Sequence, residues 1–160
     1  MKFTIGATFL IFLGVASNAW AQEKIRSTTL FLEGGGPAGF YSMNLDQIVF
    51  DREYIKAAAR IGYSYSSGSL LPLGFSLLTG KEGNYFELGV GYSLYWPQTE
   101  TVDTSNFFSA RIGYRYQNPE GGFFMNLGPM YLNGGTLGNS PPLSNRIWFG
   151  VGLGYTLHGH

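Results

Sequence analysis

Seven charged residues lie where their side chains could meet in an enclosed space and do chemistry. Each falls in a stretch of alternating polar and apolar residues, on the polar side of the alternation: Glu33, Asp46, Arg60, Glu87, Arg111, Arg115 and Arg146. Carboxylates and guanidinium groups held close together can relay protons or ions, or they can neutralise one another as buried ion pairs. We interpret the seven as a structural salt-bridge plug, because three acidic and four basic side chains nearly balance.

Folding neighbouring stretches into hairpins predicts which of these charges meet. Asp46 lies about level with Arg60 across a connection near Asp51, and Glu87 lies about level with Arg115. Glu33 and Arg146 lie near the same end of the first and last stretches, which must pair if the stretches close into a ring. Matched depth therefore predicts three ion pairs, because buried charges need partners.

Other residue types that support catalysis or ligand binding are sparse. Cysteine is absent, so the chain has neither disulfides nor thiolate metal sites. His158 and His160 are spaced so that they could share a metal ion, but we interpret them as a frayed tail. Residues 34–36 are all glycine, yet they lack the Gly-Lys-Ser/Thr ending and the helix of a phosphate-binding loop. We predict no catalytic residue, no metal site and no cofactor.

Strands must position the charges. From residue 85 to 96, apolar side chains occupy every second position and alternate with Glu87, glycines, Ser93 and phenols, which is the period of a strand. Seven other stretches share this pattern, the seventh of the eight less cleanly; all eight are 27–35, 40–50, 57–66, 70–79, 85–96, 106–117, 123–132 and 146–157. An even number of strands near the roughly 10 residues needed to cross a bilayer predicts an all-β fold. We predict an eight-stranded antiparallel transmembrane up-and-down β-barrel.

The apolar faces of these strands are predicted to look outward. Beyond residue 21, no Asp, Glu, Lys or Arg falls on the apolar side of any predicted strand. An Arg or Lys facing lipid at mid-depth costs about 2–4 kcal/mol, so a bilayer would enforce this exclusion. A soluble lipocalin-like lipid carrier would instead turn these faces inward. Aromatic residues at both ends of the faces predict two interfacial girdles, one of Tyr41, Tyr65, Trp96, Phe108 and Tyr131, the other of Phe86, Tyr116, Phe123 and Tyr155.

The first 21 residues are typical of a cleavable signal peptide. Lys2 precedes an apolar run over 5–15, and Ala19-Trp20-Ala21 forms a small-x-small cleavage site. We therefore divide the chain into a signal peptide, 1–21, and an outer-membrane barrel domain, 22–160. Charged residues make up only 12% of the chain, about half the usual share, and ten acidic residues balance ten basic ones. This balance argues against a nucleic-acid partner.

The connections predict an orientation with both termini in the periplasm. The connections 51–56, 80–84 and 118–122 are then short, charged periplasmic turns, and the two longest connections, 97–105 and 133–144, lie outside. The outer connections at 36–38 and 67–69 are tight, which predicts an outer rim that is low on one side. The two long loops are the predicted surface for contacting an external partner of unknown kind.

The last strand carries a second signal. Gly152, Tyr155 and Leu157 resemble the Gly-x-x-aromatic-x-hydrophobic pattern that barrel-assembly machinery recognises, although three residues follow Leu157 here. Several further pieces, in this order, resemble small eight-stranded outer-membrane β-barrel proteins of Bacteroidota-type bacteria: Leu32-Glu33-Gly34-Gly35-Gly36, Tyr41-Ser42-Met43-Asn44-Leu45-Asp46, Leu71-Pro72-Leu73-Gly74, Phe86-Glu87-Leu88-Gly89-Val90-Gly91, Ile112-Gly113-Tyr114-Arg115-Tyr116 and Gly121-Gly122-Phe123-Phe124. The resemblance implies a barrel and a bacterial outer-membrane location, and it carries over no activity.

Three functions are compatible with these patterns. The favoured one is a non-enzymatic outer-membrane barrel with a structural or surface-interaction role, in contact with outer-membrane lipids and lipopolysaccharide, and monomeric. The second is an enzyme that acylates or deacylates lipopolysaccharide, which needs a nucleophile activated by a base. The chain's histidines lie beyond the last strand, away from an outer-leaflet substrate. The third is the soluble lipid carrier, whose apolar faces would be buried.

Overall fold

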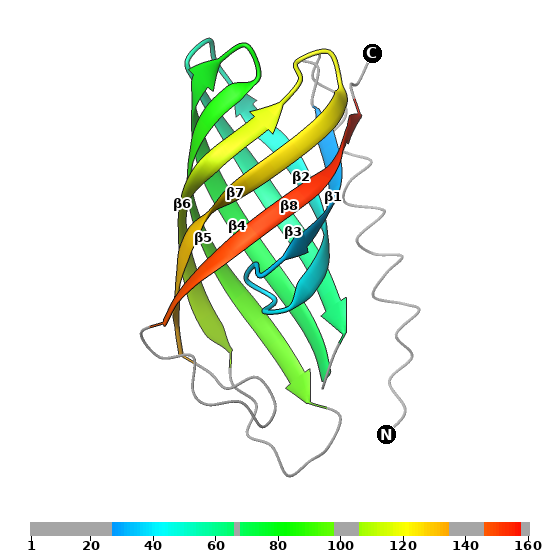
Figure 1. The fold of residues 1–160 in the computed structure, drawn as a ribbon, viewed down its shortest axis with the longest axis vertical. Helices are drawn as coiled ribbons and strands as arrows, with labels where there is room; N and C mark the ends of the chain where they lie inside the picture. Colours follow the sequence, from blue (N-terminus) through cyan, green and yellow to red (C-terminus); the bar gives the residue numbers. More distant parts are fainter. Residues whose placement is uncertain (1–26, 66–67, 98–105, 135–145, 158–160) are drawn as a thin grey trace.

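The computed structural model describes residues 27–65, 68–97, 106–134 and 146–157, which form a closed antiparallel β-barrel (Figure 1). Each strand pairs with the strands next to it in sequence, and the first pairs with the last to close the sheet. The strands are β1 (Thr28–Gly34), β2 (Tyr41–Asp51), β3 (Ile55–Tyr65), β4 (Gly68–Lys81), β5 (Asn84–Pro97), β6 (Phe107–Gln117), β7 (Gly122–Asn133) and β8 (Arg146–Leu157). The predicted all-β, eight-stranded up-and-down barrel is confirmed.

Several predictions concern residues outside the described ranges. The signal peptide 1–21, most of the two long loops, and His158 and His160 lie outside the described residues. The short connection predicted at 67–69 is shifted, because Gly68 and Ser69 already belong to β4. Among the described residues, no helix has both the length and the apolar character needed to cross a membrane.

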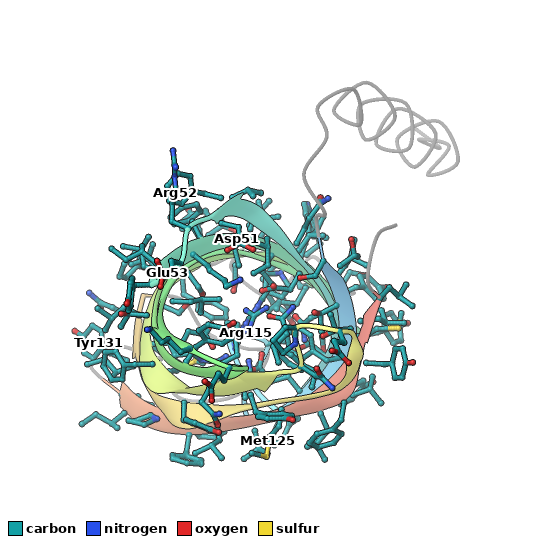
Figure 2. The ribbon with its side chains drawn as sticks, turned by 90° about the horizontal axis from the view of Figure 1, so that it is seen from above. Asp51, Arg52, Glu53, Arg115, Met125 and Tyr131 are labelled. Carbon is teal, nitrogen blue, oxygen red and sulfur yellow. The ribbon has the colours of Figure 1, made fainter. Side chains whose placement is uncertain are left out.

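The strands alternate between an apolar outer face and a polar inner face. Leu88, Val90 and Ile112 are 46%, 53% and 55% exposed, whereas Glu87 and Arg111 are 0% and 6% exposed. Seen along the barrel in Figure 2, Arg115 lies inside the ring of strands, and Met125 and Tyr131 lie outside it. The predicted outward orientation of the apolar faces is therefore confirmed. Because side chains of a strand alternate, one register sets both surfaces at once. The exception is a register shift in β2, where Val49 and Phe50 are both exposed.

Tight turns close one end of the barrel, which we call the turn end; it carries the β2–β3, β4–β5 and β6–β7 connections (Figure 1). Glu82 and Gly83 join β4 to β5 with φ values of 53° and 85°, the geometry of a two-residue type I′ hairpin. The turns are bound to their neighbours: the Gly80 amide donates to the Tyr54 carbonyl at 3.3 Å, and the Gln117 amide donates to the Gly83 carbonyl at 2.8 Å. We call the opposite end, which carries the β1–β2 turn, the loop end.

β6 and β7 lie close together at two facing glycines, Gly113 and Gly128. A side chain on Gly113 would run into the Leu127 carbonyl, and one on Gly128 would run into the Ile112 carbonyl and the Gly113 Cα. Next to this point, Pro129 has no amide to donate to the ladder. The two glycines therefore keep the β6–β7 seam closed where its hydrogen bonding is weakest.

We expect Gly128→Ala to lower the free energy of unfolding by about 1–3 kcal/mol, because the added methyl group must push the two strands apart. Urea unfolding of the refolded protein, followed by tryptophan fluorescence, measures this loss. The matched control is Gly34→Ala, where an added Cβ meets only the Phe40 carbonyl oxygen at 3.8 Å. Equal stabilities of the two variants would contradict the close approach.

Candidate functional site: the interior of the barrel

The strands bring six of the seven predicted charges together inside the barrel. Glu33, Asp46, Glu87, Arg111 and Arg115 are all buried. Arg60 is nearly so, with 7% of its side chain exposed. Arg146 lies on the inner face at the loop end and is half-buried. This arrangement follows from strand geometry, since each of these residues occupies an inward position of its strand.

Arg60 on β3 is the centre of this group. Its guanidinium lies 3.2 Å from the Glu87 carboxylate, 3.4 Å from that of Asp46 and 3.9 Å from that of Glu33. The Glu87 carboxylate also accepts a hydrogen bond from the Ser76 hydroxyl at 2.7 Å. One cation thus compensates three carboxylates that come from three different strands.

Arg115 and Arg111, both on β6, extend the network across the lumen. Arg115 donates to both carboxylate oxygens of Asp46, at 2.7 and 3.2 Å, and to the side-chain carbonyl of Gln117 at 2.7 and 3.0 Å. Gln117 in turn donates to the hydroxyl of Thr29 at 3.2 Å. Arg111 pairs with Glu33. The two-pronged contact between the Arg115 guanidinium and the Asp46 carboxylate is the strong form of an ion pair.

The pairing predicted from depth is right for one pair and wrong for two. The register places Asp46 directly opposite Arg60, and their side chains pair. Glu87 instead pairs with Arg60, and Glu33 with Arg111 and Arg60. Among the described residues, neither the Glu87–Arg115 nor the Glu33–Arg146 ion pair forms. The reason is that the lumen is narrow, so long side chains reach across it instead of along the adjacent strand.

Two inward phenylalanines complete the middle of the lumen, and neither was among the predicted site residues. Phe31 and Phe124 pack with ring centroids 4.8 Å apart. The Arg60 guanidinium lies 4.8 Å from the Phe31 ring centroid, and the Arg115 guanidinium lies 4.9 Å from that of Phe124. These cation–π contacts stabilise guanidinium groups that are already withdrawn from water. The inward positions of Phe31 and Phe124 in the alternation were the available signal.

The β1–β2 turn folds into the loop end of the lumen, a feature that was also missed. Gly35 and Gly39 have φ values of 68° and 81°. Residues 36–39 are buried, and Gly35 is half-buried. The Ser93 hydroxyl donates to the Pro37 carbonyl at 3.1 Å. Ala38 packs in an apolar cluster, the loop-end cluster, with Leu70, Tyr95, Phe107, Met130, Leu132 and Trp148. A second apolar cluster lies toward the turn end and consists of Ile48, Ala58, Leu78 and Tyr85.

The remaining predicted residues lie on the surface of the barrel wall. Eight of the nine girdle residues are exposed on the outer face: Tyr41, Tyr65, Trp96, Phe108, Tyr131, Phe86, Phe123 and Tyr155. The ninth, Tyr116, is half-buried and packs against Phe123 with ring centroids 6.2 Å apart. In the predicted assembly signal, Gly152 faces inward, and Tyr155 and Leu157 face outward. Their roles in membranes and in assembly remain predictions.

The chemistry open to the interior is ion pairing and hydrogen bonding. In the described ranges, no group of three or more His, Cys, Asp or Glu residues could hold a metal ion. The buried hydroxyls of Thr29 and Thr156 bond to each other at 2.9 Å. Every one of the six central charges has an oppositely charged partner, so the interior is a neutralised polar core.

Comparison with known proteins identifies the fold and nothing narrower. The sequence matches no protein-family model and no curated protein. Among solved structures, the barrel is similar to the N-terminal β-barrel domain of OprF from Pseudomonas aeruginosa, with a TM-score of 0.55 over 84% of this chain and 98% of that chain. The two share 15% sequence identity, so the similarity supports the barrel fold alone.

We expect Arg60→Met to lower the free energy of unfolding by about 3–5 kcal/mol, because it leaves buried carboxylates without their shared cation. Adding Glu87→Gln should recover part of this loss by removing one uncompensated charge. Urea unfolding of the refolded variants measures both effects. The control is Arg52→Met at an exposed turn position, for which a change within about 0.5 kcal/mol is expected. An Arg60 variant as stable as this control would contradict the central role of Arg60.

Proposed function

We propose that this chain is a non-enzymatic integral outer-membrane β-barrel protein with a closed, charge-filled lumen and a structural or surface-interaction role. The single observation that carries the proposal is the combination of an apolar outer face with a buried, neutralised interior. Leu153 is 52% exposed and Val90 is 53% exposed. Both lie on the outer side of the wall, together with the aromatic residues of the predicted girdles. A bilayer favours this distribution, and water does not.

The filled lumen argues against a general diffusion pore. The loop-end cluster blocks one end, the ion pairs fill the middle, and the second cluster lies toward the turn end. An eight-stranded barrel has little internal space beyond its own side chains. We therefore place function on the outside of the barrel, in its lipid contacts and at the loop end, where the loops 97–105 and 133–144 would face the cell's surroundings.

The two competing functions are less well supported. A soluble lipid carrier would bury the apolar face that this barrel exposes, so its defining feature is reversed here. A lipopolysaccharide-modifying enzyme needs a base beside a nucleophile, and the chain's two histidines are in the C-terminal tail, outside the described residues. The orientation with periplasmic termini, the monomeric state and recognition of Gly152, Tyr155 and Leu157 by assembly machinery are parts of the same proposal.

We expect the protein to fractionate with the outer membrane and to migrate faster on gels when it is not boiled, because a closed barrel resists unfolding by detergent. Membrane fractionation followed by electrophoresis of boiled and unboiled samples measures both properties. A soluble lipocalin handled in parallel is the control. Recovery of the protein in the soluble periplasmic fraction would contradict the proposal.

We expect the purified protein to produce no stable conductance steps in planar lipid bilayers, because both apolar clusters and the ion pairs between them obstruct the lumen. A known porin, reconstituted from the same detergent, shows that the bilayers report channels. Reproducible conductance of the wild-type protein would contradict a closed lumen.

A further inference from the structure

A small chamber lies in the lumen against β4 and β5, between the ion pairs and the β1–β2 turn. Its volume is about 30 Å³, and a single water needs roughly 10–15 Å³. Gly74, Gly89 and Gly91 face the chamber and leave the space that side chains would occupy. Pro37 of the β1–β2 turn also lines it.

The lining of the chamber is mainly apolar, and its charged residues are both cations. These are Arg60 and Arg111, and Ser76 and Ser109 add two hydroxyls, of which the Ser76 hydroxyl already donates to Glu87. Glu33, Asp46 and Glu87 pair with the guanidinium groups but do not line the chamber. A ligand in the chamber would therefore meet cations and hydroxyls directly and carboxylates only beyond them.

Arg111 offers two donors that nothing in the described protein accepts. Arg111 is 6% exposed, and its Nη2 pairs with Glu33. Its Nε and Nη1 are buried and have no hydrogen-bond partner. A buried donor of a charged group without an acceptor is costly, so these two nitrogens indicate an acceptor in the adjoining space.

The charges beside the chamber favour an anionic acceptor. Both charged residues of its lining, Arg60 and Arg111, are cations, and the carboxylates that pair with them do not line it. A monovalent anion would meet these two guanidinium groups directly, beside the free donors of Arg111. Burying a charge is favourable when it is paired and hydrogen-bonded.

We propose that the chamber is a binding site for one water-sized monovalent anion, such as chloride, held by Arg111 Nε and Nη1 with help from the Ser109 hydroxyl. The size of the chamber selects a halide over a carboxylate with a carbon chain or a phosphate. The inference does not depend on where in the cell the barrel resides.

The direct test is a crystal structure of the full-length protein grown in sodium bromide, with bromide located by its anomalous scattering. The expected result is a peak in contact with Arg111 Nε or Nη1, inside the chamber. An ordered chamber that contains water molecules and no anomalous peak would overturn the proposal.

A second test measures binding through stability. Anions that bind only the folded state raise the urea midpoint in proportion to the logarithm of their concentration above Kd. We expect chloride and bromide to raise the midpoint of the wild-type protein more than gluconate does at equal ionic strength, because gluconate is too large for the chamber. Equal responses to the three salts would overturn the proposal.

The variant Gly74→Ala separates the site from general salt effects. Its added methyl group would lie 3.5 Å from the Val90 carbonyl oxygen and 3.6 Å from the Arg60 Cβ, which are ordinary contacts, and it would occupy part of the chamber. We expect this variant to fold and to lose the halide-specific shift, whereas Gly34→Ala should keep it. A halide-specific shift that persists undiminished in Gly74→Ala would place the anion elsewhere and overturn the proposal.

Discussion

A barrel of eight strands has an interior too narrow for bulk water, and this constraint governs how every inward side chain is placed. A charge that enters such a space must find an opposite charge and hydrogen bonds there. The Arg60 guanidinium lies 3.2–3.9 Å from three carboxylates, and Arg115 donates two hydrogen bonds to Asp46. The ion pairs therefore occupy the middle of the interior and fix which side chains share it.

The same alternation that concentrates charge inside leaves the outside mainly apolar. Leu88 and Val90 are exposed on either side of an inward glycine, next to a fully buried Glu87. An outer surface of this kind is stable against hydrocarbon and aggregates in water. The interior network and the proposed location in a membrane are thus two consequences of one register.

The sequence was sufficient to predict the strands, but it was not sufficient to predict the contacts between their side chains. Strict alternation in 85–96 and 146–157 predicts both the strands and the face that each side chain takes, because the strand period is two. Pairing of Glu33 with Arg111, on strands distant in sequence, depends on the width of the lumen and on arginine rotamers, which no local pattern encodes. The inward fold of residues 36–39 depends on a docking surface built from β4 to β8. The tightness of that connection was visible in the sequence, and its direction was not.

The central claim is that the apolar face of the wall meets hydrocarbon. Because the chain has no cysteine, a single spin label at Val90→Cys can report the surroundings of this face in lipid vesicles, with Glu53→Cys in an exposed turn as the aqueous reference. The account predicts high collision rates of the Val90 label with oxygen, which dissolves in lipid, and low rates with a water-soluble nickel chelate. A Val90 label that collides with the nickel chelate as often as the Glu53 label does would contradict it.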